Sequence, residues 1–221
     1  MAKRVEIQAN LANLLTYIGS LYRNPADAMK EYVSNALDEW QKGDRAVPCI
    51  VDCRLEHSKI IIACNQPGMD EREFRDALQR VADSAKPGLG LPQIGQLGIG
   101  LFAFNQVGRK CTFLSKKGKN AATVKVVLCS NSDEAQFDTA LRREALEGPG
   151  TAITIEQLLQ DPLKPRSNIG FGRLQGFFAD RFDHYLRSGS LTLTIHANEK
   201  QSAVRPREVK LKPIGSAFSK V

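Results

Sequence analysis

The chain has 221 residues, of which 42% are hydrophobic and 25% charged, and its formal net charge is +7. This composition is ordinary for a globular protein, and a domain of this length buries roughly 70% of its unfolded surface. The longest apolar run, residues 60–64, is far too short for a membrane span, and the N-terminus lacks the apolar core of a signal peptide. Five cysteines fit reduced thiols better than a disulfide framework. We therefore expect a cytoplasmic protein, or a nuclear one in a eukaryote, without a membrane segment.

The clearest helix signal in the first third of the chain follows Asn24. Asn24 is a good N-cap, Pro25 suits the first helical position, and the helix should run to about Gln41 and stop at Gly43. The other elements expected in this part are a helical lead-in at 5–22, strands at 47–55 and 59–64, and an amphipathic helix at 70–82.

The rest of the chain mixes helices and strands without the regular rhythm of a doubly wound sheet. The expected elements in the middle of the chain are a Gly- and Pro-rich mobile loop at 83–95, a buried helix at 97–107, a basic hairpin at 109–125 and a polar stretch at 131–148. After these we expect a strand from Thr151, a helix, a strand at 191–195, and a last strand or linker at 201–221. That helix carries an apolar stripe made of Leu174, Phe177, Phe178, Phe182, Tyr185 and Leu186. This order favours a single α+β domain over residues 1–221, a two-layer sandwich with helices on one face of a mixed, mostly antiparallel sheet.

The positive charge is concentrated in two segments. Residues 109–125 carry six basic side chains and no acid, and residues 198–221 carry six against two acids. Such segments can attract nucleic acid, although no aromatic side chains alternate with the charges of the hairpin to stack on bases. Two interpretations of the hairpin stay open, a solvated turn and a surface that attracts phosphates.

One face of the helix after Asn24 carries polar groups suited to phosphate chemistry. Glu31, Asn35 and Asp38 fall within about 60° of one another around a helix. An amide oxygen is a suitable Mg²⁺ ligand, and a carboxylate one turn earlier can deprotonate a water that attacks a phosphoryl group. The alternative is an ordinary solvated face, so the functional interpretation needs a phosphate-binding element nearby.

The segment Gly95-Gln96-Leu97-Gly98-Ile99-Gly100 can supply that element. Glycines let backbone N–H groups approach phosphate oxygens, and a helix N-terminus favours an anion. A tight packing turn would explain the glycines almost as well. The segment matches neither the Walker pattern nor a dinucleotide fingerprint.

In combination, these motifs resemble the GHKL superfamily of gyrase, 90-kDa heat-shock chaperones, histidine kinases and MutL. Residues 31–38 match the helix motif E-x-x-x-N-A-x-D, residues 94–102 the glycine motif, and Gly150-Thr151 the later Gly-Thr. Residues 21–25, which lead into the helix that carries this motif, are most similar to the 90-kDa chaperones. The helix and strand near 174–195 also resemble microrchidia and type II topoisomerase relatives. The resemblance covers about residues 10–196 and implies the Bergerat-type ATP-binding fold.

The resemblance also implies residue roles. Glu31 would be the general base, Asn35 the Mg²⁺ ligand, and Gly95, Gly98 and Gly100 the phosphate cradle. Thr151 would lie beside the adenine base of the nucleotide, and Met69 would line the pocket that holds this base. The other residues implied at the nucleotide site are Asp38, Cys64, Gln66, Gly68, Gln96, Leu97 and Ile99, together with Ser84 and Lys86 of the lid.

One motif departs from the family pattern. Where the family has Asp-x-Gly-x-Gly-Met, this chain reads Cys64-Asn65-Gln66-Pro67-Gly68-Met69. The family's carboxylate accepts a hydrogen bond from the adenine amino group, and a thiol accepts poorly. Losing that partner costs roughly 1–3 kcal/mol, or about ten- to a hundredfold in affinity. Asn65 should not substitute, because neighbouring strand residues point to opposite faces, whereas Gln66 either supplies a replacement acceptor or fills the pocket.

By resemblance, we expect Mg²⁺-dependent binding and slow hydrolysis of ATP, with ADP as product, in a chaperone-like or DNA-transaction ATPase. Residues 83–95 would close as a lid, residues 1–20 would be an exchange segment, and ATP would drive homodimerisation. A further C-terminal domain or partner protein is also expected. Two alternatives stay open: a nucleotide-binding regulatory module without significant turnover, and a nucleic-acid-binding module that uses the basic hairpin.

A metal site at Cys49, Cys53 and His57 is not expected. These residues are four apart, but on a strand that spacing is about 13 Å, which is too far for one zinc ion. His184 and His196 lack partners at a catalytic spacing, so we interpret them as structural or surface histidines.

Overall fold

The computed structural model describes residues 3–6, 24–84, 99–132, 134–139 and 143–207. The strands in these parts are β1 (Lys3–Glu6), β2 (Cys49–Leu55), β3 (Lys59–Cys64), β4 (Lys110–Lys116), β5 (Val124–Cys129), β6 (Glu134–Asp138), β7 (Gly150–Glu156), β8 (Leu191–Ala197) and β9 (Lys200–Ala203). The helices are α2 (Pro25–Lys42), α3 (Glu71–Ser84), the 3₁₀ helix η2 (Ile99–Gln106), α4 (Phe171–Arg181) and α5 (Asp183–Arg187).

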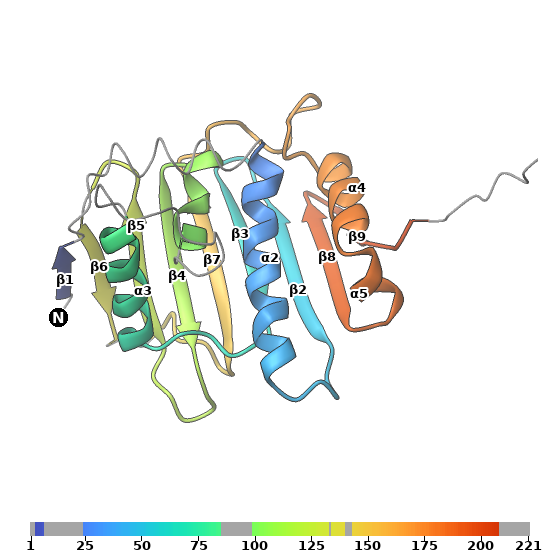
Figure 1. The fold of residues 1–221 in the computed structure, drawn as a ribbon. Coiled ribbons are helices and arrows are strands. Elements are labelled where there is room, and N and C mark those ends of the chain that lie inside the picture. The colour runs from blue at the N-terminus through green and yellow to red at the C-terminus, as the bar shows by residue number, and fades with distance from the viewer. Residues whose placement is uncertain (1–2, 7–23, 85–98, 133, 140–142, 208–221) are drawn as a thin grey trace, which may run out of the picture.

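The described strands form one sheet in the order β1-β6-β5-β4-β7-β3-β2-β8-β9. Neighbours are antiparallel except for β2 and β8, which are parallel. The helices cover one face of the sheet (Figure 1). The expected two-layer α+β architecture with a mixed, mostly antiparallel sheet is therefore confirmed.

Helix α2 lies across the middle of the sheet and forms as its sequence predicts. Asn24 accepts a hydrogen bond from the Asp27 N–H (3.1 Å), and Asn24 Nδ2 donates to the Asp27 carboxylate (2.8 Å). At the other end, the Gly43 N–H donates to carbonyls of the last turn. The face opposite Glu31 is buried in the core; its members include Met29, Val33, Ala36, Leu37 and Trp40. The local capping and the apolar stripe thus agree, which fixes the direction in which the polar face points.

Three expected elements differ from the structure. The helix expected at 97–107 is the 3₁₀ helix η2, in which Leu101 to Phe104 are buried. Gly108 follows two residues after the end of η2, and a Cβ there would lie 2.5 Å from the Glu156 carbonyl of β7, so the turn into β4 must be tight. The polar stretch 131–148 contains β6, whose alternating Ala135 and Phe137 are buried. Residues 5 and 6, expected in a helix, belong to β1, and the rest of that lead-in lies outside the described residues.

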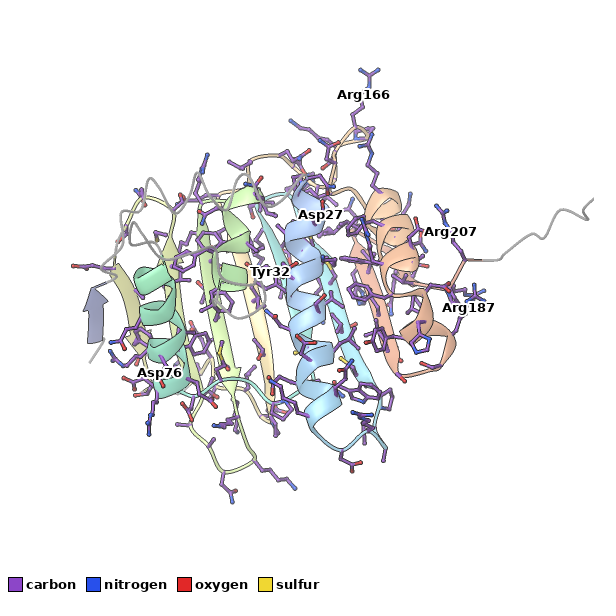
Figure 2. The ribbon with its side chains drawn as sticks, in the orientation of Figure 1. Asp27, Tyr32, Asp76, Arg166, Arg187 and Arg207 are labelled. Atoms are coloured by element: carbon purple, nitrogen blue, oxygen red, sulfur yellow. The ribbon has the colours of Figure 1, made fainter. Side chains whose placement is uncertain are left out.

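The elements near the C-terminus follow the expected apolar pattern with one break. The predicted helix is divided at Phe182 into α4 and α5, yet Leu174, Phe178 and Phe182 are buried as the stripe predicted. The tail forms the short strand β9, so the expectation of a last strand is confirmed for this part. Arg207 binds Asp180 (2.6 Å) and Arg187 binds Asp183 (2.7 Å), near α5 at the edge of the molecule (Figure 2). No helix within the described ranges is long and apolar enough to cross a membrane.

The basic hairpin forms from β4 and β5, but much of its charge is already paired. Lys117 binds Asp70 (3.1 Å) and Glu73 (2.7 Å) of the neighbouring α3 region. Lys110 binds Glu156, Lys125 binds Glu144, and Lys116 donates to the carbonyls of residues 146 and 147. Four of the six basic side chains therefore have acceptors within the protein. The number of basic side chains in residues 109–125 therefore overstates the positive charge that this surface can offer to phosphates.

Candidate functional site

A cavity of about 660 Å³ lies between α2 and α3, above the adjacent strands β3, β7 and β4. Nine predicted site residues line it: Glu31, Asn35, Asp38, Cys64, Gln66, Gly68, Met69, Gly100 and Thr151. Its apolar walls come from residues such as Ile62, Phe74, Phe113 and Ile153. Residues that are far apart in the sequence thus meet in one pocket large enough for a nucleotide-sized ligand.

The other predicted site residues are only partly described. Ser84 is the last residue of α3, so the loop expected from residue 83 begins no earlier than residue 85. Ile99 is the first residue of η2. Lys86, Gly95, Gln96, Leu97 and Gly98 lie outside the described residues.

The wall formed by α2 is polar. Glu31, Asn35 and Asp38 all line the cavity, as their spacing on the helix predicted. Glu31 is half-buried, with 23% of its side chain exposed, and its Oε1 lies 3.3 Å from Lys30 Nζ. The start of η2 comes close to this wall, because a Cβ on Gly100 would lie 3.4 Å from Asn35 Nδ2. Gly100 therefore lies next to the face of α2 that carries the Glu31 carboxylate and the Asn35 amide.

The same helix carries Tyr32, which also lines the cavity. Tyr32 is buried and projects from α2 beside η2 (Figure 2), where its ring packs edge-on against Phe113 of β4 at 6.2 Å. This contact ties α2 to the sheet directly under the cavity. The position of Glu31 thus depends on packing as well as on helix geometry.

The floor of the cavity is polar where β3 and β7 meet. Cys64 and Thr151 are register partners across these strands. The Cys64 sulfur faces the backbone N–H groups of Gln66 and Thr151 and the Thr151 hydroxyl. Burial raises the pKa of the Cys64 thiol above its usual value, against the opposing effect of these hydrogen bonds. At neutral pH this position therefore holds an uncharged thiol.

Gly68 closes the floor between β4 and β7. A Cβ here would lie 2.1 Å from Ser115 Oγ, 2.7 Å from Thr151 Oγ1 and 2.8 Å from the Gly150 carbonyl. The Gly68 N–H donates to the Lys116 carbonyl (3.1 Å), and Ser115 Oγ donates to the Met69 carbonyl (2.8 Å). Only glycine fits this space without displacing a strand end or a polar contact.

Ser115 is the main site residue that the sequence did not indicate. It is fully buried, lines the cavity and is the register partner of Thr151 across β4 and β7. A buried serine in an alternating strand is a weak signal, and its relation to the site depends on strand pairing. Glu39 and Lys42 of α2 also line the cavity and bind each other at 2.6 Å.

The cavity can hold a metal only with help from the ligand. Within the described ranges, no group of three His, Cys, Asp or Glu side chains can hold a metal ion. An exposed amide oxygen from Asn35, with carboxylates one turn away on each side, suits a Mg²⁺ ion that keeps water and phosphate oxygens as its other ligands. Burial raises the pKa values of the Cys49 and Cys53 thiols, which belong to β2, to about 12.

Comparison with models of protein families gives a match. No curated protein matches the chain. Residues 22–148, more than half of the chain, match the family model described as histidine kinase-, DNA gyrase B-, and HSP90-like ATPase. The matched segment contains α2, the motif at Cys64 to Met69 and Gly100, each of which contributes residues to the cavity lining. The chain therefore belongs to the histidine kinase-, DNA gyrase B- and HSP90-like ATPase family.

Proposed function

We propose that the cavity binds ATP with Mg²⁺ and that the protein hydrolyses this ATP slowly. The observation that carries the proposal is the meeting of Glu31 and Asn35 of α2 with Gly68 and Thr151 of the strand floor in one cavity. The first pair offers groups for phosphate and metal, and the second lies at a partly apolar floor suited to a flat base. Family membership supports ATP as the nucleotide.

In this proposal Glu31 is the general base. Its carboxylate orients a water molecule toward the terminal phosphoryl group and accepts a proton from it. The water oxygen bonds to phosphorus as the bond from phosphorus to the bridging oxygen breaks, and ADP leaves. The Asn35 amide oxygen would hold Mg²⁺, which when bound would neutralise charge on the phosphates. Residues 95–100 present backbone N–H groups to the phosphate oxygens. Met69 and Thr151 contact the nucleobase, and Asp38 lies on the same cavity wall as Glu31 and Asn35.

The remaining parts of the proposal concern what binding achieves. We assign lid closure to the segment that follows α3, residues 85–95, with Ser84 and Lys86 near its start, and homodimerisation to the ATP-bound state, in a chaperone-like or DNA-transaction ATPase. Slow hydrolysis would then time the release of the closed state. A change in sedimentation from monomer to dimer with a non-hydrolysable ATP analogue tests this part separately.

A second candidate is a regulatory module that binds nucleotide without significant turnover. The observation that favours it is the uncharged Cys64 thiol on the cavity floor, where the family has a carboxylate. Titration with ATP, ADP, GTP and a non-hydrolysable analogue in the presence of Mg²⁺, followed by measurement of phosphate release, separates the candidates. Binding with release supports the first, binding without release supports the second, and no binding by any nucleotide contradicts both.

The Cys64→Asp variant is expected to bind ATP about tenfold more tightly than the wild type. A carboxylate at this position would accept the hydrogen bonds that now reach the sulfur, and would still have a lone pair for an amino group on the base. Isothermal titration calorimetry measures the change. Cys129→Asp, at a half-buried cysteine outside the cavity, is the control. Unchanged affinity in Cys64→Asp would show that this position does not contact the base.

A further inference from the structure

Two neighbouring amides form a clasp at the floor of the cavity. Asn65 Oδ1 accepts hydrogen bonds from the Ile50 N–H (2.8 Å) and from Gln66 Nε2 (2.8 Å), and Asn65 Nδ2 donates to the Pro48 carbonyl (3.2 Å). Asn65 is exposed and does not line the cavity, whereas Gln66 is only 8% exposed and does. The clasp thus connects the surface at the start of β2 with the interior of the site.

The clasp fixes which way the Gln66 amide points. A backbone N–H can only be met by an oxygen, so the Ile50 N–H determines the orientation of the Asn65 amide. The Pro48 carbonyl requires a donor and gives the same orientation. Asn65 Oδ1 therefore faces Gln66, and Gln66 must present its nitrogen to it. Rotating the Gln66 amide by 180° would place two carbonyl oxygens against each other in a partly buried position.

With its nitrogen held, Gln66 has a carbonyl oxygen left for a ligand. In the described parts of the chain no group donates a hydrogen bond to Gln66 Oε1. The side chain is more than nine-tenths buried on the cavity wall, so this acceptor needs a partner from within the cavity. The natural partner is an N–H group of the bound molecule.

The neighbouring Cys64–Thr151 pair has the opposite polarity. The two residues are register partners across β3 and β7, both line the cavity, and each side chain carries one hydrogen. Whichever group donates within the pair, the other retains a hydrogen for the cavity. The floor thus offers one fixed acceptor, at Gln66, beside one available donor.

We propose that the Asn65–Gln66 clasp makes the site select a purine with an amino group, rather than an oxo group, at ring position 6. The amino group donates to Gln66 Oε1, and the adjacent ring nitrogen accepts from the Cys64–Thr151 pair. A 6-oxo purine has both polarities reversed, and the fixed amide cannot rotate to meet it. This inference rests on the proposed function, because it concerns the base of the same nucleotide.

The test compares ATP with ITP, which carries the 6-oxo base on the same ribose and triphosphate. The wild type is expected to bind ATP at least about tenfold more tightly than ITP, because the wrong base leaves buried polar groups unpaired. Asn65→Ala releases Gln66 to rotate, so the ratio of the two affinities should fall toward one with little change for ATP. Asn65→Asp keeps an acceptor for the Ile50 N–H and for Gln66 Nε2, and should keep the ratio.

The controls separate this inference from the proposed function. Asn120→Ala, in the exposed turn of the basic hairpin, should leave both affinities unchanged. Equal binding of ATP and ITP by the wild type would overturn the inference and leave nucleotide binding intact. An unchanged ratio in Asn65→Ala would also overturn it, provided that circular dichroism shows a folded protein. Binding of neither nucleotide would contradict the proposed function itself.

Discussion

Replacing Glu31 with glutamine is expected to reduce ATP-dependent phosphate release by about 100-fold or more, the usual contribution of a general base. The amide keeps the size of the side chain and its place on the cavity wall, but it cannot accept a proton from water. ATP affinity should change little, because the proposed contacts of the nucleotide with Asn35 and the strand floor remain. Single-turnover phosphate release with saturating ATP and Mg²⁺ measures the effect on the chemical step.

Glu39→Gln provides the matched control for this prediction. Glu39 lines the same cavity from the same helix, about two turns from Glu31, and is bound to Lys42. Its replacement should leave the rate within a few-fold of the wild type. If both variants release phosphate at the wild-type rate, Glu31 is not the base. If neither variant nor the wild type releases phosphate while all bind ATP, the regulatory candidate is favoured.

Replacing Gly68 with alanine is expected to lower the free energy of unfolding by about 1–3 kcal/mol, the cost of inserting an atom into a filled space. The new Cβ would overlap Ser115 Oγ and Thr151 Oγ1, and it would press on the carbonyl of Gly150, which belongs to a backbone that cannot turn aside. The strand ends that form the floor must separate to admit it. Urea denaturation followed by circular dichroism measures the loss.

The matched control is Gly118→Ala in the hairpin turn, where a Cβ would meet nothing within 4 Å. That variant should unfold at nearly the same urea concentration as the wild type. ATP affinity should fall in Gly68→Ala and stay constant in Gly118→Ala, because only the first change enters the cavity. A Gly68→Ala protein with wild-type stability and affinity would mean that the strand ends yield more easily than their contacts indicate.

The parts of the site that were predictable from sequence are those set by local rules. Helix α2 carries its own cap, its own stop and an apolar stripe, so the common direction of Glu31 and Asn35 followed from spacing alone. The opposite direction of Asn65 and Cys64 followed in the same way from strand alternation. The family resemblance placed Thr151 and Gly68 in the same pocket, which no local rule could have done.

The parts that were not predictable depend on contacts between distant segments. Ser115 joins the site because β4 pairs with β7 in one register, and a shift by one residue would turn it away. The charge of the hairpin was misjudged for the same reason, since Lys117 meets Asp70 and Glu73 only in the folded sheet. Strand β6 was overlooked although Ala135 and Phe137 alternate with polar residues, because its length is near the lower limit for such a pattern.

The position of β7 has a consequence for the order in which the protein can fold. This strand lies between β3 and β4 in the sheet but follows both of them in the chain. The hairpin of β2 and β3 and the group of β4 to β6 therefore have no common hydrogen bonds until residues 150–156 insert between them. The long separation between β3 and β7 makes this a slow step, because a large loop must close first. More than two thirds of the chain must leave the ribosome before the pocket can exist, because β7 ends at residue 156. A fragment limited to residues 22–148 would carry the helix motif and the glycine motif, but it would lack Gly150-Thr151 and the strand that joins the two parts of the sheet.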